Sequence, residues 1–148
     1  MKKLAGLAFL FLIFISASDP APLPSPMMHS LQGTWELKNF YNYDGTNVTD
    51  TIPTTEGYRQ IKMYYNGKVM WTRYVPKDSV EWFGYGSYRI TTDRLIETLE
   101  YGSASMMQNI EFPMNFEFEL ILNDNSYSQI TIDESGNRTF SENYVRID

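Results

Sequence analysis

Residues 58–75 read YRQIKMYYNGKVMWTRYV, and their pattern is the strongest local indication of secondary structure in the chain. Side chains on both sides of the Asn66-Gly67 pair alternate with a period of two, which is the period of a β-strand. A type I′ turn needs positive φ at both central residues, and Asn-Gly meets this need better than almost any other pair. The stretch therefore predicts a β-hairpin with strands at residues 58–65 and 68–75.

Six more short runs share this period and are separated by turn residues. They predict strands at residues 34–43, 83–91, 94–101, 114–122, 127–132 and 139–147. Residues 46–56 are polar and are predicted to form a loop, whereas residues 102–113 form a longer connection with room for one helical turn. Met106 and Met107 in that connection suggest either a mobile lid over one end or a plain capping turn.

Eight short strands joined in sequence order predict an all-β fold. We expect an eight-stranded antiparallel up-and-down barrel, because closing a meander removes the exposed strand edges that invite aggregation. A barrel of this size has an interior just wide enough for side chains or one small ligand. An open sandwich is the alternative that periodicity leaves open.

The N-terminus has the pattern of a secretory signal peptide, predicted at residues 1–18. Lys2 and Lys3 precede an uncharged apolar run that ends in small residues, and the run is too short to span a bilayer. Residues 19–30 contain four alternating prolines and are predicted to form a stiff tether. The barrel domain is predicted at residues 31–148. We expect an exported protein, periplasmic or secreted and bacterial, with no membrane span after cleavage.

Composition excludes several kinds of chemistry. The chain has no cysteine, and its one histidine, His29, lies in the predicted tether, so thiolate nucleophiles, Ser-His-Asp triads and multi-histidine metal sites are excluded. The net charge is −6 with no basic cluster, which argues against binding nucleic acid or anionic membranes. We therefore predict no cofactor, no metal and no catalytic residues.

Three patches of the sequence carry a resemblance to a known family. The N-terminal patch is LQGTWEL at residues 31–37, the middle patch comprises GYGSY at 84–88 and ETLEYGS at 97–103, and the last is NYVR at 143–146. Together they resemble small secreted lipocalin-like proteins of the calycin superfamily, of the Bacteroidetes type, whose function is undetermined. The resemblance implies a barrel that Gly33 and Trp35 close at the bottom, with Arg146 packed over the Trp35 ring.

Candidate ligand-binding residues lie on the middle strands. Trp71 and Arg73 share a strand face and are suited to stacking on, and hydrogen bonding to, a planar or anionic ligand. Tyr85, Tyr88 and Tyr101 combine an apolar ring with a polar tip and can line a cavity or fill it.

One of the two glutamates on the same segment is also a candidate. Glu97 and Glu100 have opposite parity on one strand, so only one of them faces inward. Glu97 is inward if Leu95, Leu99 and Tyr101 are inward. A buried carboxylate needs a partner, and Arg73, Arg89 and Arg146 are the candidates.

These residues favour non-enzymatic binding of a small, apolar or aromatic ligand. The predicted pocket consists of Trp71, Arg73, Tyr88, Glu97 and Tyr101. One alternative is a fully packed barrel that acts as a structural or interaction module of the cell envelope, and another is a carboxylate-dependent enzyme. The identity of the ligand and the oligomeric state do not follow from the sequence.

Overall fold

The computed structural model describes residues 30–77 and 80–148. The predicted signal peptide and all but the last residue of the predicted tether lie outside the described residues. The elements, in chain order, are β1 (Gly33–Gly45), β2 (Val48–Pro53), β3 (Arg59–Tyr65), β4 (Lys68–Tyr74), β5 (Trp82–Ile90), β6 (Arg94–Gly102), α1 (Ala104–Met107), β7 (Met114–Leu122), β8 (Ser126–Ile132) and β9 (Arg138–Arg146).

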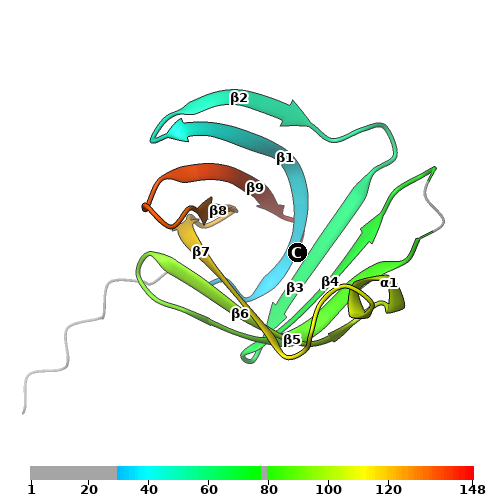
Figure 1. Ribbon diagram of the computed structural model, residues 1–148. Helices are drawn as coiled ribbons and strands as arrows, with labels where there is room; N and C mark the ends of the chain where they lie inside the picture. Colours follow the sequence, from blue (N-terminus) through cyan, green and yellow to red (C-terminus); the bar gives the residue numbers. More distant parts are fainter. Residues whose placement is uncertain (1–29, 78–79) are drawn as a thin grey trace, which may run out of the picture.

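The described strands form one antiparallel sheet of nine strands in the order β2-β1-β3-β4-β5-β6-β7-β8-β9. Strand β1 also pairs with β9, so the sheet closes in a ring (Figure 1). The prediction of an all-β, antiparallel fold is confirmed. Strand β2 is an addition to the predicted set, and each of the other eight strands overlaps a predicted one.

Strand β2 lies where the sequence predicted a loop, so that prediction was wrong. The first residues of β1, Gly33–Glu36, pair with β3, whereas Asn39–Tyr43 pair with β2 along the edge that β3 leaves free. Every residue of β2 is exposed. A strand without a buried face gives no hydrophobic period, and here the backbone hydrogen bonds to β1 define it.

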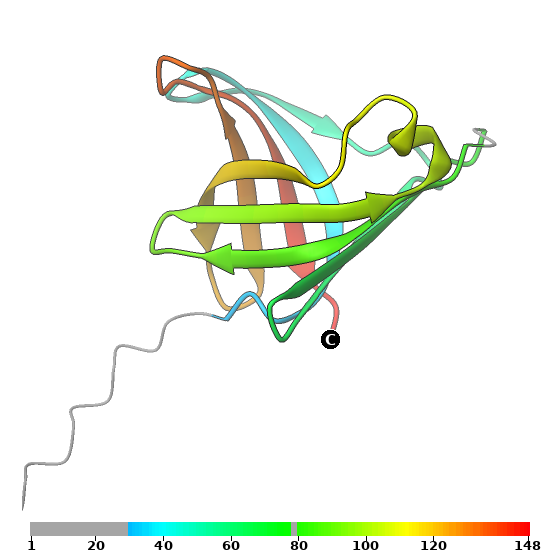
Figure 2. The ribbon, with the colours of Figure 1, turned by 60° about the horizontal axis from the view of Figure 1, so that its bottom comes forward.

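The hairpin predicted at Asn66-Gly67 is confirmed. The two residues have φ of +47° and +74°, as a type I′ turn requires, and Tyr65 pairs with Lys68 directly across the turn. The helix α1 is a single turn at the opposite end of the ring, where β6 ends and β7 begins (Figure 2). Among the described residues, no helix is both long and apolar enough to cross a membrane.

One end of the ring is filled by a cluster that we call the closed end. It consists of Leu31, Trp35, Tyr64, Tyr127 and Tyr144, all essentially inaccessible to solvent. The Trp35 indole donates a hydrogen bond to the Leu31 carbonyl (2.8 Å) and meets the Tyr127 ring edge-on at 4.9 Å. Tyr127 in turn stacks on Tyr144 at 4.7 Å. These contacts between rings from β1, β8 and β9 seal the interior on this side.

Arg146 covers the closed end from outside. Its guanidinium carbon lies 4.1 Å from the centroid of the Trp35 ring, and it donates hydrogen bonds to the backbone carbonyls of Ser30 and Gln32. Gly33 makes room for this arrangement, because a Cβ at that position would lie 2.1 Å from Arg146 Nη1. Gly33, Trp35 and Arg146, which the resemblance selected together, therefore meet in the structure.

Candidate functional site

The interior of the ring beyond the closed end holds a cavity of about 400 Å³. Its walls come from β3 to β9 and from α1 with the loop that follows it. The apolar lining residues are Trp71, Trp82, Leu99, Met106, Ile110, Phe116 and Phe118. The polar lining residues are Gln60, Lys62, Arg73, Glu97, Ser105, Asn109, Gln129 and Glu142.

Strand β3 turns its polar side chains into the ring. Gln60, Lys62 and Tyr64 are buried, whereas Met63 and Tyr65 are 47% and 77% exposed on the outer face. This arrangement reverses the usual rule that the apolar face of a strand is the buried one. The consequence is a layer of buried and half-buried polar groups between the closed end and the cavity. We call this layer, consisting of Gln60, Lys62, Glu97, Gln129 and Glu142, the polar floor.

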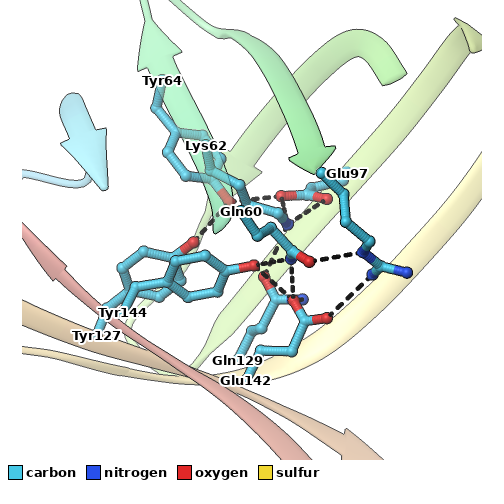
Figure 3. Close-up of polar contacts among 9 residues, drawn as sticks. Gln60, Lys62, Tyr64, Glu97, Tyr127, Gln129, Glu142 and Tyr144 are labelled. Atoms are coloured by element: carbon cyan, nitrogen blue, oxygen red, sulfur yellow. Dashed lines mark hydrogen bonds and ion pairs between the residues drawn. The ribbon is translucent and has the colours of Figure 1, made fainter. Parts of the chain in front are cut away.

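An ion pair between Lys62 and Glu97 forms one half of the polar floor. The Lys62 ammonium donates to both carboxylate oxygens of Glu97, at 2.9 and 3.1 Å, and to Gln129 Oε1 at 2.8 Å (Figure 3). The Tyr64 hydroxyl donates a further hydrogen bond to Glu97 Oε1 (2.5 Å). Both charged side chains are only 4% exposed. Since all three ammonium protons have acceptors, the pair satisfies the requirement for burying charge.

Glu142 is the centre of the other half of the polar floor. Its Oε2 accepts hydrogen bonds from Gln129 Nε2 (3.0 Å), Gln60 Nε2 (3.2 Å) and the Tyr144 hydroxyl (2.6 Å). Gln60 Oε1 accepts in turn from Arg73 Nε at 2.8 Å. The two halves are linked through Gln129, so the floor is one continuous hydrogen-bonded network (Figure 3).

The hydroxyls of the three closed-end tyrosines lie beside the polar floor. Those of Tyr64 and Tyr144 donate to it directly, and that of Tyr127 lies 3.2 Å from the Tyr64 hydroxyl. Burial raises the pKa of Tyr64, Tyr127 and Tyr144 well above 10.0, the ordinary value. The carboxylate of Glu97 raises the pKa of the first two further, and that of Glu142 acts on Tyr144 in the same direction. All three phenols therefore remain protonated through the neutral range and can donate hydrogen bonds.

Arg73 stands at the border of the polar floor, between two tryptophans. Its guanidinium carbon lies 5.9 Å from the Trp71 ring centroid and 6.0 Å from that of Trp82. Trp71 packs over Gly84 on the neighbouring strand, where a Cβ would lie 2.6 Å from the indole nitrogen. Because Gly84 has no side chain, the Trp71 indole can pack against β5 and line the cavity.

The structure brings three of the five predicted pocket residues together. Trp71, Arg73 and Glu97 all line the cavity. Tyr88 packs edge-on against Tyr64 at 4.8 Å and belongs to the packing around the closed end. The partner of Glu97 was predicted to be Arg73, Arg89 or Arg146, but it is Lys62.

Tyr101 lies on the outside of the ring, 47% exposed, so its prediction as a pocket residue was wrong. The cause is a β-bulge in β6. Leu99 pairs with Gly86 and Tyr101 pairs with Tyr85, which leaves Glu100 as an extra residue. Leu95, Glu97 and Leu99 face inward, and the extra residue reverses the alternation beyond them. Tyr85 follows Tyr101 to the outer face, where their rings lie 5.4 Å apart.

The connection after β6 contributes to the cavity through its helical turn. Met106 is buried and lines the cavity, whereas Met107 is exposed. Residues that sequence reasoning missed include Gln60, Lys62, Gln129 and Glu142 of the polar floor and Trp82 of the wall. Within residues 30–77 and 80–148, no group of three or more His, Cys, Asp or Glu side chains is placed to hold a metal ion.

Comparisons with known proteins concern the fold alone. The chain matches no protein-family model and no curated protein. Among solved structures it is similar to an uncharacterised protein from Bacteroides eggerthii, with a TM-score of 0.53 and 15% sequence identity. The similarity covers 80% of this chain and 100% of that one.

Proposed function

We propose that this chain is a lipocalin-like barrel that binds a small, largely apolar or aromatic molecule without transforming it. The observation that carries the proposal is the cavity of about 400 Å³ with aromatic walls. Ligand pockets typically measure about 300–1,000 Å³ and combine apolar walls with a few placed polar groups. The polar floor supplies such groups at one end of the cavity.

The rival functions have less support. A packed structural barrel would fill its interior with side chains, as the closed end does, since protein interiors are close-packed. A two-carboxylate hydrolase would need two carboxylates available to one substrate. The carboxylates that line the cavity are Glu97 and Glu142, and both oxygens of Glu97 accept hydrogen bonds from Lys62 in a buried ion pair.

The lipocalin-like assignment and the export of the protein belong to the same proposal. The assignment is supported by the ring closure through β1 and β9 and by the contact of Arg146 with Trp35. Export to the periplasm or the medium rests on the sequence of residues 1–18, with the lysine pair and apolar run of a signal peptide.

Native mass spectrometry of the protein purified gently from its own source tests the binding function. We expect a stoichiometric small molecule on the folded protein, released when the protein is denatured. The mass of the bare chain alone, unchanged after incubation with a metabolite extract of the source cells, would contradict the proposal. A variant with Leu99→Trp, which fills the cavity, provides the control and is expected to lose the bound molecule.

A further inference from the structure

Two side chains at the border of the polar floor have unused hydrogen-bonding capacity that faces the cavity. Glu142 Oε1 accepts no hydrogen bond from any described residue, and Arg73 Nη2 lies 3.8 Å away, too far for one. The Arg73 side chain donates through Nε to Gln60 and also hydrogen-bonds with the Tyr58 side chain, so the described residues use at most two of its five N–H groups. A set of strong donors and a strong acceptor therefore stand side by side on the cavity wall.

The charges around the cavity are balanced before any ligand enters. The ionisable lining residues are Lys62 and Arg73, which are basic, and Glu97 and Glu142, which are acidic. Lys62 and Glu97 neutralise each other directly. An anion that approached Arg73 would also approach the Glu142 carboxylate, and like charges that close repel strongly where water is scarce. A neutral polar group meets no such penalty.

We propose that the cavity selects a neutral, planar molecule that carries a hydrogen-bond acceptor next to a donor, such as an amide, lactam or urea edge. Its acceptor takes N–H bonds from Arg73, and its donor binds Glu142 Oε1, so both unused groups are satisfied at once. The planar body lies among the rings of Trp71, Trp82 and Phe116. This inference names the ligand class for the binding function proposed above and rests on it.

A matched pair of probes tests the selection by charge. Naphthalene-2-carboxamide and 2-naphthoate share one apolar body and differ in whether the polar edge is neutral or anionic. We expect the carboxamide to bind at least about tenfold more tightly at neutral pH, measured by calorimetry or by quenching of tryptophan fluorescence. Equal or tighter binding of the naphthoate would overturn the inference.

The variant Glu142→Gln removes the repelling charge while keeping the size of the side chain. We expect it to tighten the binding of 2-naphthoate about tenfold and so to remove most of the preference for the carboxamide. The matched control is Glu119→Gln, since Glu119 also pairs with an arginine, Arg138, but does not line the cavity. This control should leave both affinities unchanged. An unchanged preference in a folded Glu142→Gln variant would contradict the inference.

A second variant covers the case in which Glu142→Gln does not fold. Arg73→Lys keeps the positive charge but loses the planar fork of donors, at a side chain that is 32% exposed and so tolerates change. We expect the carboxamide to bind about tenfold more weakly to it, and unchanged affinity would overturn the inference.

The natural ligand distinguishes this inference from the binding function itself. A neutral molecule with an amide-type edge, recovered in the native mass spectrum, would support both. A fatty acid or another carboxylate recovered from the protein would overturn the ligand class and leave the binding function standing. Failure of the wild-type protein to bind either probe would also overturn the ligand class, and the native spectrum would then decide on the binding function independently.

Discussion

The closed end and the cavity end of the ring are built from the same kind of residue with opposite results. At the closed end, Trp35, Tyr127 and Tyr144 meet one another across the ring and exclude solvent. At the cavity end, Trp71, Trp82 and Phe116 are partly accessible to solvent. They line a cavity of about 400 Å³. Aromatic content alone therefore does not decide whether an interior is packed or open.

The polar floor between the two ends explains the difference. Buried charges hold their positions only while each hydrogen bond is made, so the floor fixes the facing strands at a set distance. The tyrosines of the closed end direct their hydroxyls toward it, as Tyr64 does toward Glu97 and Tyr144 toward Glu142. On the other side of the floor, the lining side chains leave about 400 Å³ of open space.

The largest difference between the two ends should appear on removing a tryptophan. We expect Trp35→Ala to lower the free energy of unfolding by about 3–5 kcal/mol, because the ring is fully buried and leaves a void. Trp82→Ala should cost roughly 1 kcal/mol, since that ring already borders open space. Urea denaturation measures both, and similar losses at the two sites would contradict the distinction.

Breaking the ion pair of the polar floor should have an effect of nearly the same size. We expect Lys62→Met to cost about 3–5 kcal/mol, because it leaves the Glu97 carboxylate buried without its counter-charge. The double variant Lys62→Met/Glu97→Leu should be more stable than the single one, since no charge then stays unpaired. A double variant less stable than Lys62→Met would show that the pair does not act as a unit.

Alkaline pH should destabilise the protein through the tyrosines of the closed end. Their folded pKa values lie above those of the unfolded chain, so their stabilisation is complete below pH about 10 and is lost as the pH rises further. Each contributes a slope of about 1.4 kcal/mol per pH unit. Tyr64→Phe should reduce the slope of unfolding free energy against pH by that amount. An undiminished slope in a folded Tyr64→Phe variant would contradict this expectation.

The smallest effect on stability is expected from breaking a second lysine–glutamate pair, which lies on the outer surface of the ring. Lys68 and Glu100 approach to 3.0 Å, as Lys62 and Glu97 do to 2.9 Å, but their side chains are 50% and 44% exposed. We expect Lys68→Met to leave the midpoint of urea denaturation close to that of the wild type, because exposed ion pairs contribute little to stability. Comparing it with Lys62→Met separates the effect of burial from that of residue type. A loss of stability as large as that of Lys62→Met would contradict this expectation.

The strand pattern of this protein could be predicted from its sequence because turn chemistry and period-two alternation are local. The Asn66-Gly67 turn is an example, since its positive φ values depend only on the two residues. Strand β2 escaped prediction because it has no buried face. The sequence also did not predict that Tyr101 faces outward, because the bulge at Glu100 depends on the register between β6 and β5.

The site was predictable only in part, and the polar floor shows why. Alternation in β3 places Gln60 and Lys62 on one face and Ile61 and Met63 on the other. Because the apolar face of a strand is usually the buried one, the sequence alone would place Ile61 and Met63 inside. The structure places the polar pair inside, because partners on distant strands satisfy them: Glu97 binds Lys62, and Glu142 binds Gln60. Such partners are 35 and 82 residues away in the sequence, beyond the reach of any local pattern.

One end of this interior is packed and the other is open. The most direct test measures the unfolding free energy of two variants that each introduce a phenylalanine. Val69 is fully buried and pairs with Tyr64 of the closed end, so Val69→Phe adds bulk where no space exists and should cost about 1–3 kcal/mol. Leu99→Phe grows into the cavity and should cost less than about 0.5 kcal/mol. Equal losses in the two variants would contradict the claim, because they would mean that side chains already fill the space beside Leu99.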